Sequence, residues 1–210
     1  MEIIEVDSED AQMAAGLEMM KGMVTEYYFS QEKSMTKTDM MGGMIKSTTL
    51  VDNSTKDLTI LMDVMGNRMH VETNQEKNKM IDQGDDMMED LKISYDENDS
   101  KSILGYNCIK ATIEGMATDG PTGDMAFTMY VTDEIKASNQ MIQGMDKIEI
   151  KGFPLQYVLE NDLMSMTYEA VEINKDLDKG VFDVKTAGYT KMTMEEFMEQ
   201  MGSMGGGMGF

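Results

Sequence analysis

Apolar and polar residues alternate with a period of two over much of the first third of the chain, a pattern typical of strands that bury one face. Five segments of this kind follow one another, at residues 23–29, 34–39, 44–51, 57–65 and 68–73. Short turn sequences separate them, including Gly42-Gly43 and Gly66-Asn67. The pattern therefore predicts an antiparallel meander of five strands.

Strand patterns return in the second half of the chain, at residues 106–114, 125–131, 155–160 and 164–173. The clearest alternation places Phe127 and Met129 on the same face, with Thr128 and Tyr130 on the other. A sheet of this many strands curls, because each strand is rotated against its neighbour. We expect an α+β, β-rich fold: a twisted antiparallel sheet, bent as a half-barrel, with a few short helices against its concave face.

Methionine-rich segments predict the helices that cover this face, at residues 11–20, 80–91 and 193–201. Ser8 or Asp10 is the expected N-cap of the first helix. Thr193 is the expected N-cap of the last, with Glu195 and Glu196 in its first turn. If these helices cover the concave face only in part, a hydrophobic groove remains.

The sequence predicts a single β-rich domain at residues 1–201. Within it, acidic residues crowd the stretch 74–102, which we interpret as a helical or loop excursion. These acids do not follow the spacing of an EF-hand, so we interpret them as solvated charges. Residues 202–210 contain five glycines and are expected to be a flexible tail.

The composition removes most of the side chains that carry out chemistry. The 210 residues include 28 methionines but no tryptophan, and only one cysteine, one histidine and one arginine. Acidic residues outnumber Lys and Arg by 39 to 18, which gives a formal net charge of −21. Such a surface repels phosphate backbones, so we expect no nucleic-acid partner. No run approaches the ~18 apolar residues of a transmembrane helix, so we expect no transmembrane segment.

The lone histidine and cysteine give little basis for catalysis. His70 lies between Arg68 and Glu72 on the polar face of a predicted strand, and we interpret it as a surface residue. Cys108 shares a strand face with Tyr106 and is interpreted as a small buried hydrophobic residue. A nucleophile–base pair would require folding to join these two distant residues. We expect neither an enzyme nor a bound cofactor.

The methionines have two interpretations. Their unbranched thioether side chains repack around varied ligands, which favours a groove that binds a lipid or another hydrophobic molecule. Alternatively, methionine fills the core in place of leucine, as apolar stripes usually do. The ligand-binding prediction rests on apolar strand faces and names Met62, Met69, Phe127, Met129 and Tyr157.

Two further function classes stay open. Soft thioethers favour Cu(I), so the methionines near the C-terminus could form a metal site. The candidate ligands are Met192, Met194, Met198, Met201 and Met204. The other class is a structural or interaction protein without a ligand, whose acidic exterior docks a basic partner.

Several short motifs resemble an uncharacterised family of bacterial envelope proteins. The segment Ile103-Leu104-Gly105-Tyr106-Asn107-Cys108-Ile109-Lys110 is similar to the family's "ILGY-x-C-x-K" strand. Lys151-Gly152-Phe153-Pro154-Leu155 resembles the turn of related GLPGLI proteins, although it departs from that motif after Pro154. The resemblance covers roughly residues 23–201.

This resemblance implies a curved antiparallel sheet like that of LolA-like lipoprotein carriers. It also implies an extracytoplasmic protein, in the periplasm or associated with the outer membrane. On that basis we expect that a signal peptide has been removed from this sequence. The family implies no catalytic residues.

Overall fold

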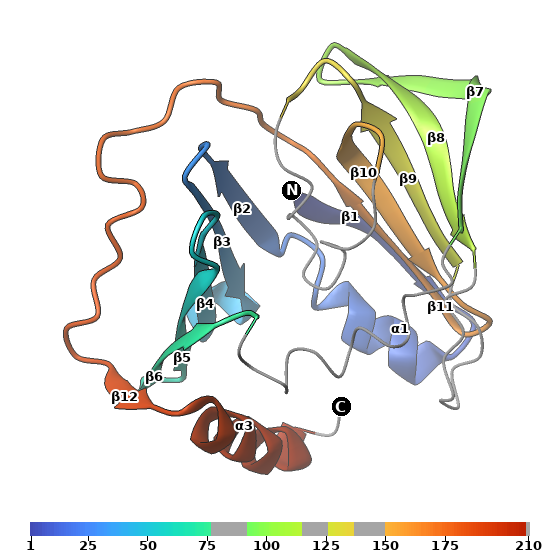
Figure 1. The fold of residues 1–210 in the computed structure, drawn as a ribbon. Coiled ribbons are helices and arrows are strands. Elements are labelled where there is room, and N and C mark those ends of the chain that lie inside the picture. Colours follow the sequence, from blue (N-terminus) through green and yellow to red (C-terminus); the bar gives the residue numbers. More distant parts are fainter. Residues whose placement is uncertain (77–91, 115–125, 137–149, 209–210) are drawn as a thin grey trace. The chain divides into compact units, whose positions relative to one another are not determined.

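The computed structural model divides into two compact units and describes residues 1–76, 92–114, 126–136 and 150–208 (Figure 1). The first unit contains Met1–Glu26 and Gln83–Asp176, and the second contains Tyr27–Asp82 and Leu177–Phe210. Each unit is therefore assembled from two separate stretches of the chain.

The first unit is an antiparallel sheet, with six strands among its described residues in the order β1-β11-β10-β9-β8-β7. These strands are β1 (Glu2–Ser8), β7 (Lys92–Ile103), β8 (Tyr106–Glu114), β9 (Ala126–Thr132), β10 (Phe153–Glu160) and β11 (Met164–Glu169). The helix α1 (Ala11–Glu18) follows β1. Asp10, one of the two predicted caps, accepts hydrogen bonds from the amides of Gln12 and Met13 at 2.9 and 2.8 Å.

The second unit contains the predicted meander. Its strands are β3 (Lys33–Met40), β4 (Ile45–Asp52), β5 (Asp57–Val64) and β6 (Asn67–Asn74), each antiparallel to the next, with the short helix η1 (Met41–Gly43) between β3 and β4. The strand β2 (Val24–Phe29) begins in the first unit, where it pairs with β1, and precedes β3 in the strand order. A short strand, β12 (Thr190–Met192), pairs parallel to β6.

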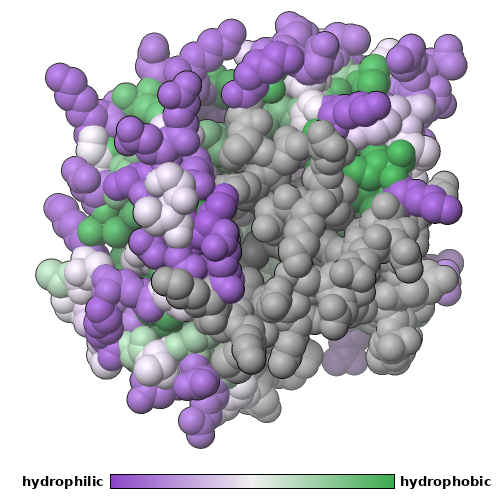
Figure 2. All heavy atoms as spheres, viewed as in Figure 1, coloured by the Kyte–Doolittle hydropathy of each residue, from purple (hydrophilic) through white to green (hydrophobic). Residues whose placement is uncertain are grey.

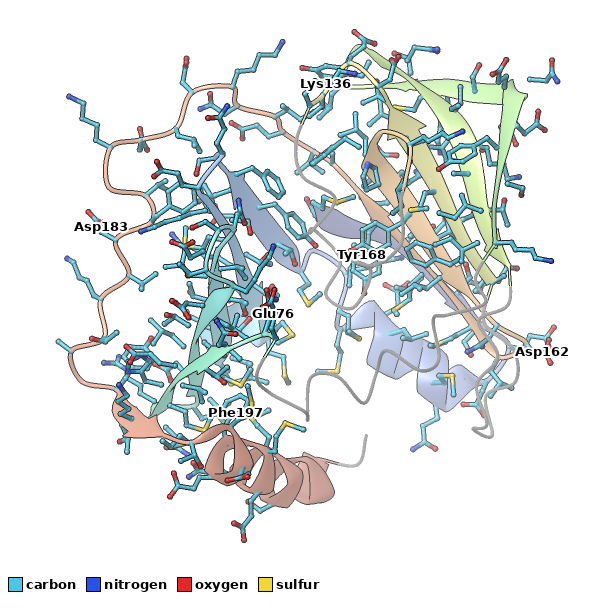
Figure 3. The ribbon with its side chains drawn as sticks, viewed as in Figure 1. Glu76, Lys136, Asp162, Tyr168, Asp183 and Phe197 are labelled. Atoms are coloured by element: carbon cyan, nitrogen blue, oxygen red, sulfur yellow. The ribbon has the colours of Figure 1, made fainter. Side chains whose placement is uncertain are left out.

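The core of the second unit lies between its sheet and the helix α3 (Met194–Met208). Met69 and Val71 of β6 are fully buried there, and Phe197 of α3 packs against them (Figure 3). Leu58, Ile60 and Val64 of β5 are buried in the same cluster, and Met62 packs against it, so alternate residues of this strand share one face. The period-two pattern of the strands therefore builds this core.

The predicted start of α3 is confirmed. The Thr193 side chain accepts a hydrogen bond from the Glu196 amide at 3.2 Å, and the Glu196 carboxylate accepts one from the Thr193 amide at 2.8 Å. This reciprocal pair is a capping box. The helix then continues to Met208, through residues that the sequence suggests are a flexible tail.

Three strands differ from the sequence predictions. Residues 92–103 form β7, although the acidic stretch 74–102 predicts a helix or loop there. A strand needs apolar residues on only one face, and in β7 Ile93 and Tyr95 supply them while acids point outward. The strands β1 and β12 also have no clear sequence signal. The predicted helix at residues 80–91 lies outside the described residues.

The general fold prediction is confirmed at a coarser level: the chain is β-rich, antiparallel in nearly all its pairings, and carries short helices among its described residues. Polar and charged side chains make up much of the coloured surface in Figure 2, with apolar residues between them, as the acidic composition predicts. None of the described helices has the length and apolar character that crossing a membrane requires.

Candidate apolar binding face

Two rows of apolar side chains cross all six strands of the first unit on one face of its sheet. The strand register places Tyr168 opposite both Ile3 and Tyr157, and Tyr157 opposite Met129. One row consists of Ile3, Tyr168, Tyr157, Met129, Ala111 and Tyr95, and the other of Val6, Met166, Leu159, Phe127, Ile113 and Ile93. We call these twelve residues the apolar face; five strands align by simple alternation, and in β1 a register shift between Ile3 and Glu5 brings Ile3 and Val6 into line with the two rows.

Aromatic rings stack in the middle of the apolar face. The ring centroids of Tyr157 and Tyr168 are 4.5 Å apart, and those of Phe127 and Tyr157 are 5.7 Å apart. Phe127 and Met129 are fully buried, whereas Tyr157 and Tyr168 are only partly buried. The centre of the face therefore presents some aromatic surface instead of being wholly enclosed.

The helix α1 covers one end of the apolar face. Its Leu17 is buried against Ile3, Val6 and Met166. Flexible side chains surround this contact, namely the partly buried Met13, Met20, Met23 and Met164. Tyr168 packs against the same group of residues, so the aromatic stack begins where the helix contact ends.

The structure separates the five predicted ligand-binding residues. Phe127, Met129 and Tyr157 lie together on the apolar face of the first unit. Met62 and Met69 pair with each other across β5 and β6 in the second unit, where Met69 is fully buried in the core. Whether any of the five contacts a ligand stays a prediction.

The predicted copper ligands near the C-terminus do not all share one environment. Met192, Met194 and Met201 are partly buried and pack against the core cluster around Phe197. Met198 is 51% exposed on α3. Met204 lies outside the residues whose side chains are described. Within the described ranges, no group of three or more His, Cys, Asp or Glu side chains is arranged to hold a metal ion.

Polar side chains line part of the opposite face of the first sheet. Lys101 donates a hydrogen bond to Gln156, whose amide donates to Glu169 at 2.6 Å. The Lys101 ammonium also lies 3.7 Å from the centre of the Tyr130 ring. Burial lowers the pKa of Lys101, because it disfavours the charged ammonium form.

A second group of contacts extends this polar network. The Tyr130 hydroxyl donates to Asp99 at 2.9 Å, and the Lys110 ammonium lies 3.1 Å from the other oxygen of Asp99. The hydrogen bond from Lys110, followed by that from Tyr130, lowers the pKa of Asp99. Each charged group has a partner, so the network resembles a structural one more than a reactive centre.

Cys108 is fully buried on β8, which agrees with its interpretation as a small hydrophobic residue. Burial raises the pKa of its thiol and therefore disfavours the thiolate. The thiolate is the nucleophile and the metal ligand in cysteine chemistry. Cys108 is thus poorly suited to either role.

The interpretation of His70 as a surface residue is wrong. His70 is only 5% exposed, because β12 pairs alongside β6 and places Lys191 on one side of it, while Leu61 of β5 lies on the other. Its Nε2 atom lies 3.3 Å from a carboxylate oxygen of Glu72. A hydrogen bond from Lys191 lowers the pKa of Glu72. His70 and Cys108 belong to different units.

A comparison with known protein families finds one family model that matches this chain. The model of the "Domain of unknown function (DUF4412)" family matches residues 11–189, which is most of the sequence. The chain belongs to the DUF4412 family. This result agrees with the expectation of an uncharacterised family.

Comparison with solved structures gives a weak match. A structure described as PNGF-II in space group P21 has a TM-score of 0.46 and 12% sequence identity to the DUF4412 chain. The match covers 85% of the DUF4412 chain and 29% of the other, so the chain spans less than a third of that protein's length. No curated protein matches the sequence.

Sequence reasoning missed Tyr95 and Tyr168 of the DUF4412 chain as members of the apolar face. Tyr95 alternates with Ile93 across Ser94, a short period-two signal that the neighbouring acids conceal. Tyr168 alternates with Met166 in the same way on β11. Their alignment with Tyr157 and Met129 depends on the order and register of the strands. Neither can be read from the local sequence pattern.

Proposed function

We propose that the apolar face of the first unit binds a hydrophobic molecule without catalysing a reaction. The observation that carries this proposal is the partly exposed stack of Tyr157 and Tyr168, in a row whose neighbours Ile3 and Met129 are fully buried. Stacked aromatic rings offer a flat apolar surface at low cost in conformational entropy.

The side chains around this stack suit an adaptable site. Methionine has an unbranched, polarizable side chain that fills irregular spaces, and Met13, Met20 and Met164 border the face. Burial of apolar surface contributes about 25 cal/mol per Å². A ligand that covered ~200 Å² of the face would gain about 5 kcal/mol before the costs of association.

The chemistry of the other side chains supports a binding role over an enzymatic one. The Cys108 thiol is buried, and the charged groups of the polar network have partners within the protein. The resemblance of the sequence motifs to bacterial envelope proteins suggests which class of ligand binds and where the protein acts. We propose a lipid or an acylated protein segment as the ligand, a sheet curved like that of LolA-like carriers, and an extracytoplasmic site of action.

Displacement of a fluorescent probe tests the proposal. The dye phenylnaphthylamine becomes fluorescent in apolar sites, and oleate should displace it from the wild-type protein. Tyr168→Ser should lower the affinity for both the dye and oleate at least about tenfold, equivalent to ~1.4 kcal/mol. The reason is that the substitution removes one of the two stacked tyrosine rings. Tyr168→Phe should bind like the wild type, because the ring remains.

A matched control is available in the second unit. Tyr189 is also partly buried, and it lies beside Arg68 instead of on the apolar face. Tyr189→Ser should leave oleate binding unchanged. Equal losses in Tyr168→Ser and Tyr189→Ser, or no displaceable dye in the wild type, would refute the proposed function.

A further inference from the structure

Methionines gather at one end of the second unit, at the tips of two turns. The first turn, Met41–Met44, connects β3 to β4, and the pair Met40–Ile45 closes it. The second turn, Met65-Gly66, connects β5 to β6, and the pair Val64–Asn67 closes it. Because Ile45 pairs with Val64, both turns leave the sheet at the same end.

The two turns are joined directly. The amide of Met65 donates a hydrogen bond to the carbonyl of Met44 at 2.7 Å. Met41 lies at the other end of the four-residue turn that contains Met44. A backbone hydrogen bond thus holds Met65 beside Met44, and Met41 belongs to the same four-residue turn as Met44.

All three methionines are exposed, and two of them adopt a conformation that large side chains avoid. Met41, Met44 and Met65 are 44%, 45% and 74% exposed. Met41 has φ 54° and Met65 has φ 53°, in the left-handed region that favours Gly, Asn and Asp. A large apolar residue at such a position gains little from burial, so core packing does not account for Met41 and Met65.

The charged residues next to the turns are paired with one another. Asp39 of β3 pairs with Lys46 of β4 at 3.6 Å, and Asp63 of β5 pairs with Arg68 of β6 at 2.8 Å. These carboxylates already have cationic partners, so they offer little to hard divalent cations. The thioether sulfur atoms of Met41, Met44 and Met65 are the soft donors at the tips.

We propose that Met41, Met44 and Met65 form a binding site for Cu(I). Thioethers are soft ligands that prefer Cu(I) over hard cations such as Mg²⁺ and Ca²⁺. The long, flexible methionine side chains allow three sulfur atoms from adjacent turns to converge on one ion. This site differs from the methionines near the C-terminus, three of which pack against the core, and it does not depend on the apolar face.

Titration with Cu(I) tests the site. The full-length protein, kept anaerobic with ascorbate, competes with the chromophoric chelator bicinchoninate. The expected result is one Cu(I) per chain. In the variant with Met41→Leu, Met44→Leu and Met65→Leu, affinity should fall at least about tenfold, because loss of even outer-shell partners has an effect of that size. Leucine keeps the volume and apolar character of methionine, so only the sulfur is lost.

A matched variant carries Met19→Leu, at an exposed methionine away from these turns that is not among the candidate copper ligands. It should bind Cu(I) like the wild type, and circular dichroism should show both variants folded. Ag(I), which has the same preference for sulfur, should shift the methyl NMR signals of Met41, Met44 and Met65 together. Full affinity in the triple variant, an equal loss in the matched variant, or no competition by the wild type would each overturn the proposal.

Discussion

At the residue scale, the most unusual positions are large apolar residues with positive φ. Met41 and Met65 share this conformation with Leu104, which precedes Gly105 in the turn between β7 and β8. Turns of this kind normally contain Asn-Gly or Asp-Gly. The sequence shows the glycines plainly, but it gives no sign that the residue before each one is left-handed and exposed.

The strain at Met65 predicts a stabilising substitution. Met65→Asn should raise the free energy of unfolding by ~1 kcal/mol, because Asn tolerates the left-handed region at lower cost. Met44 has φ −70°, so Met44→Asn should give no such gain. Urea denaturation of the two variants measures the difference. Equal stabilities in Met65→Asn, Met44→Asn and the wild type would show that Met65 is not strained.

Asp52 predicts a pH dependence. Its carboxylate accepts hydrogen bonds from the Ser54 hydroxyl and from the Ser54 and Thr55 amides at 2.6, 3.0 and 2.9 Å, which lower its pKa to about 2. The folded state therefore favours the charged form. This contribution is present above about pH 4, the usual pKa of Asp, and is lost as the pH falls toward 2.

Asp52→Ala should accordingly be less stable than the wild type at neutral pH. The difference should shrink as the pH falls from about 4 to 2, because the wild-type carboxylate becomes protonated over that range. Urea denaturation at a series of pH values measures it. A difference that stays constant down to pH 2 would contradict the role of these hydrogen bonds.

At the element scale, α3 depends on its N-terminal cap. The capping box of Thr193 and Glu196 satisfies two helical amides just before Phe197 packs into the core. Thr193→Ala should destabilise the protein by about 1 kcal/mol in thermal or urea unfolding, whereas Thr193→Ser should have little effect. If Thr193→Ser is as destabilising as Thr193→Ala, the hydroxyl group of Thr193 does not stabilise the helix.

A strand can be predicted from the sequence when the strand that it pairs with is close to it in the chain. The meander from β3 to β6 is predicted well, because each strand pairs with the next and the turns carry Gly or Asn. In contrast, β1 pairs with β11 from the far end of the chain, and β12 pairs parallel to β6. Such pairings leave no local pattern, and β12 is what buries His70 on a strand face that the sequence pattern alone marks as exposed.

The residues of the candidate binding site are likewise predicted only in part. The alternation around Phe127 and Met129 predicts that both lie on an apolar strand face, and they do. Met62 and Met69 show equally good alternation, yet they belong to the other unit. Period-two patterns identify which residues face a core but not which core they face.

At the scale of the whole molecule, each unit joins two distant stretches of the chain. The first unit takes β1 and α1 from the N-terminus and the remaining strands from residues 83–176. The proposed apolar site and the proposed Cu(I) site fall in different units. The two functions can therefore be tested separately in the same full-length protein.

The methyl groups of the methionines allow the most direct test of the central claim, that the apolar face of the first unit binds a hydrophobic ligand. In a methyl NMR titration with oleate, the account predicts shifts at Met129, Met164 and Met166, on or beside the face, and none at Met69 and Met192 in the core of the second unit. Shifts confined to Met69 and Met192, or none at any methionine, would contradict it.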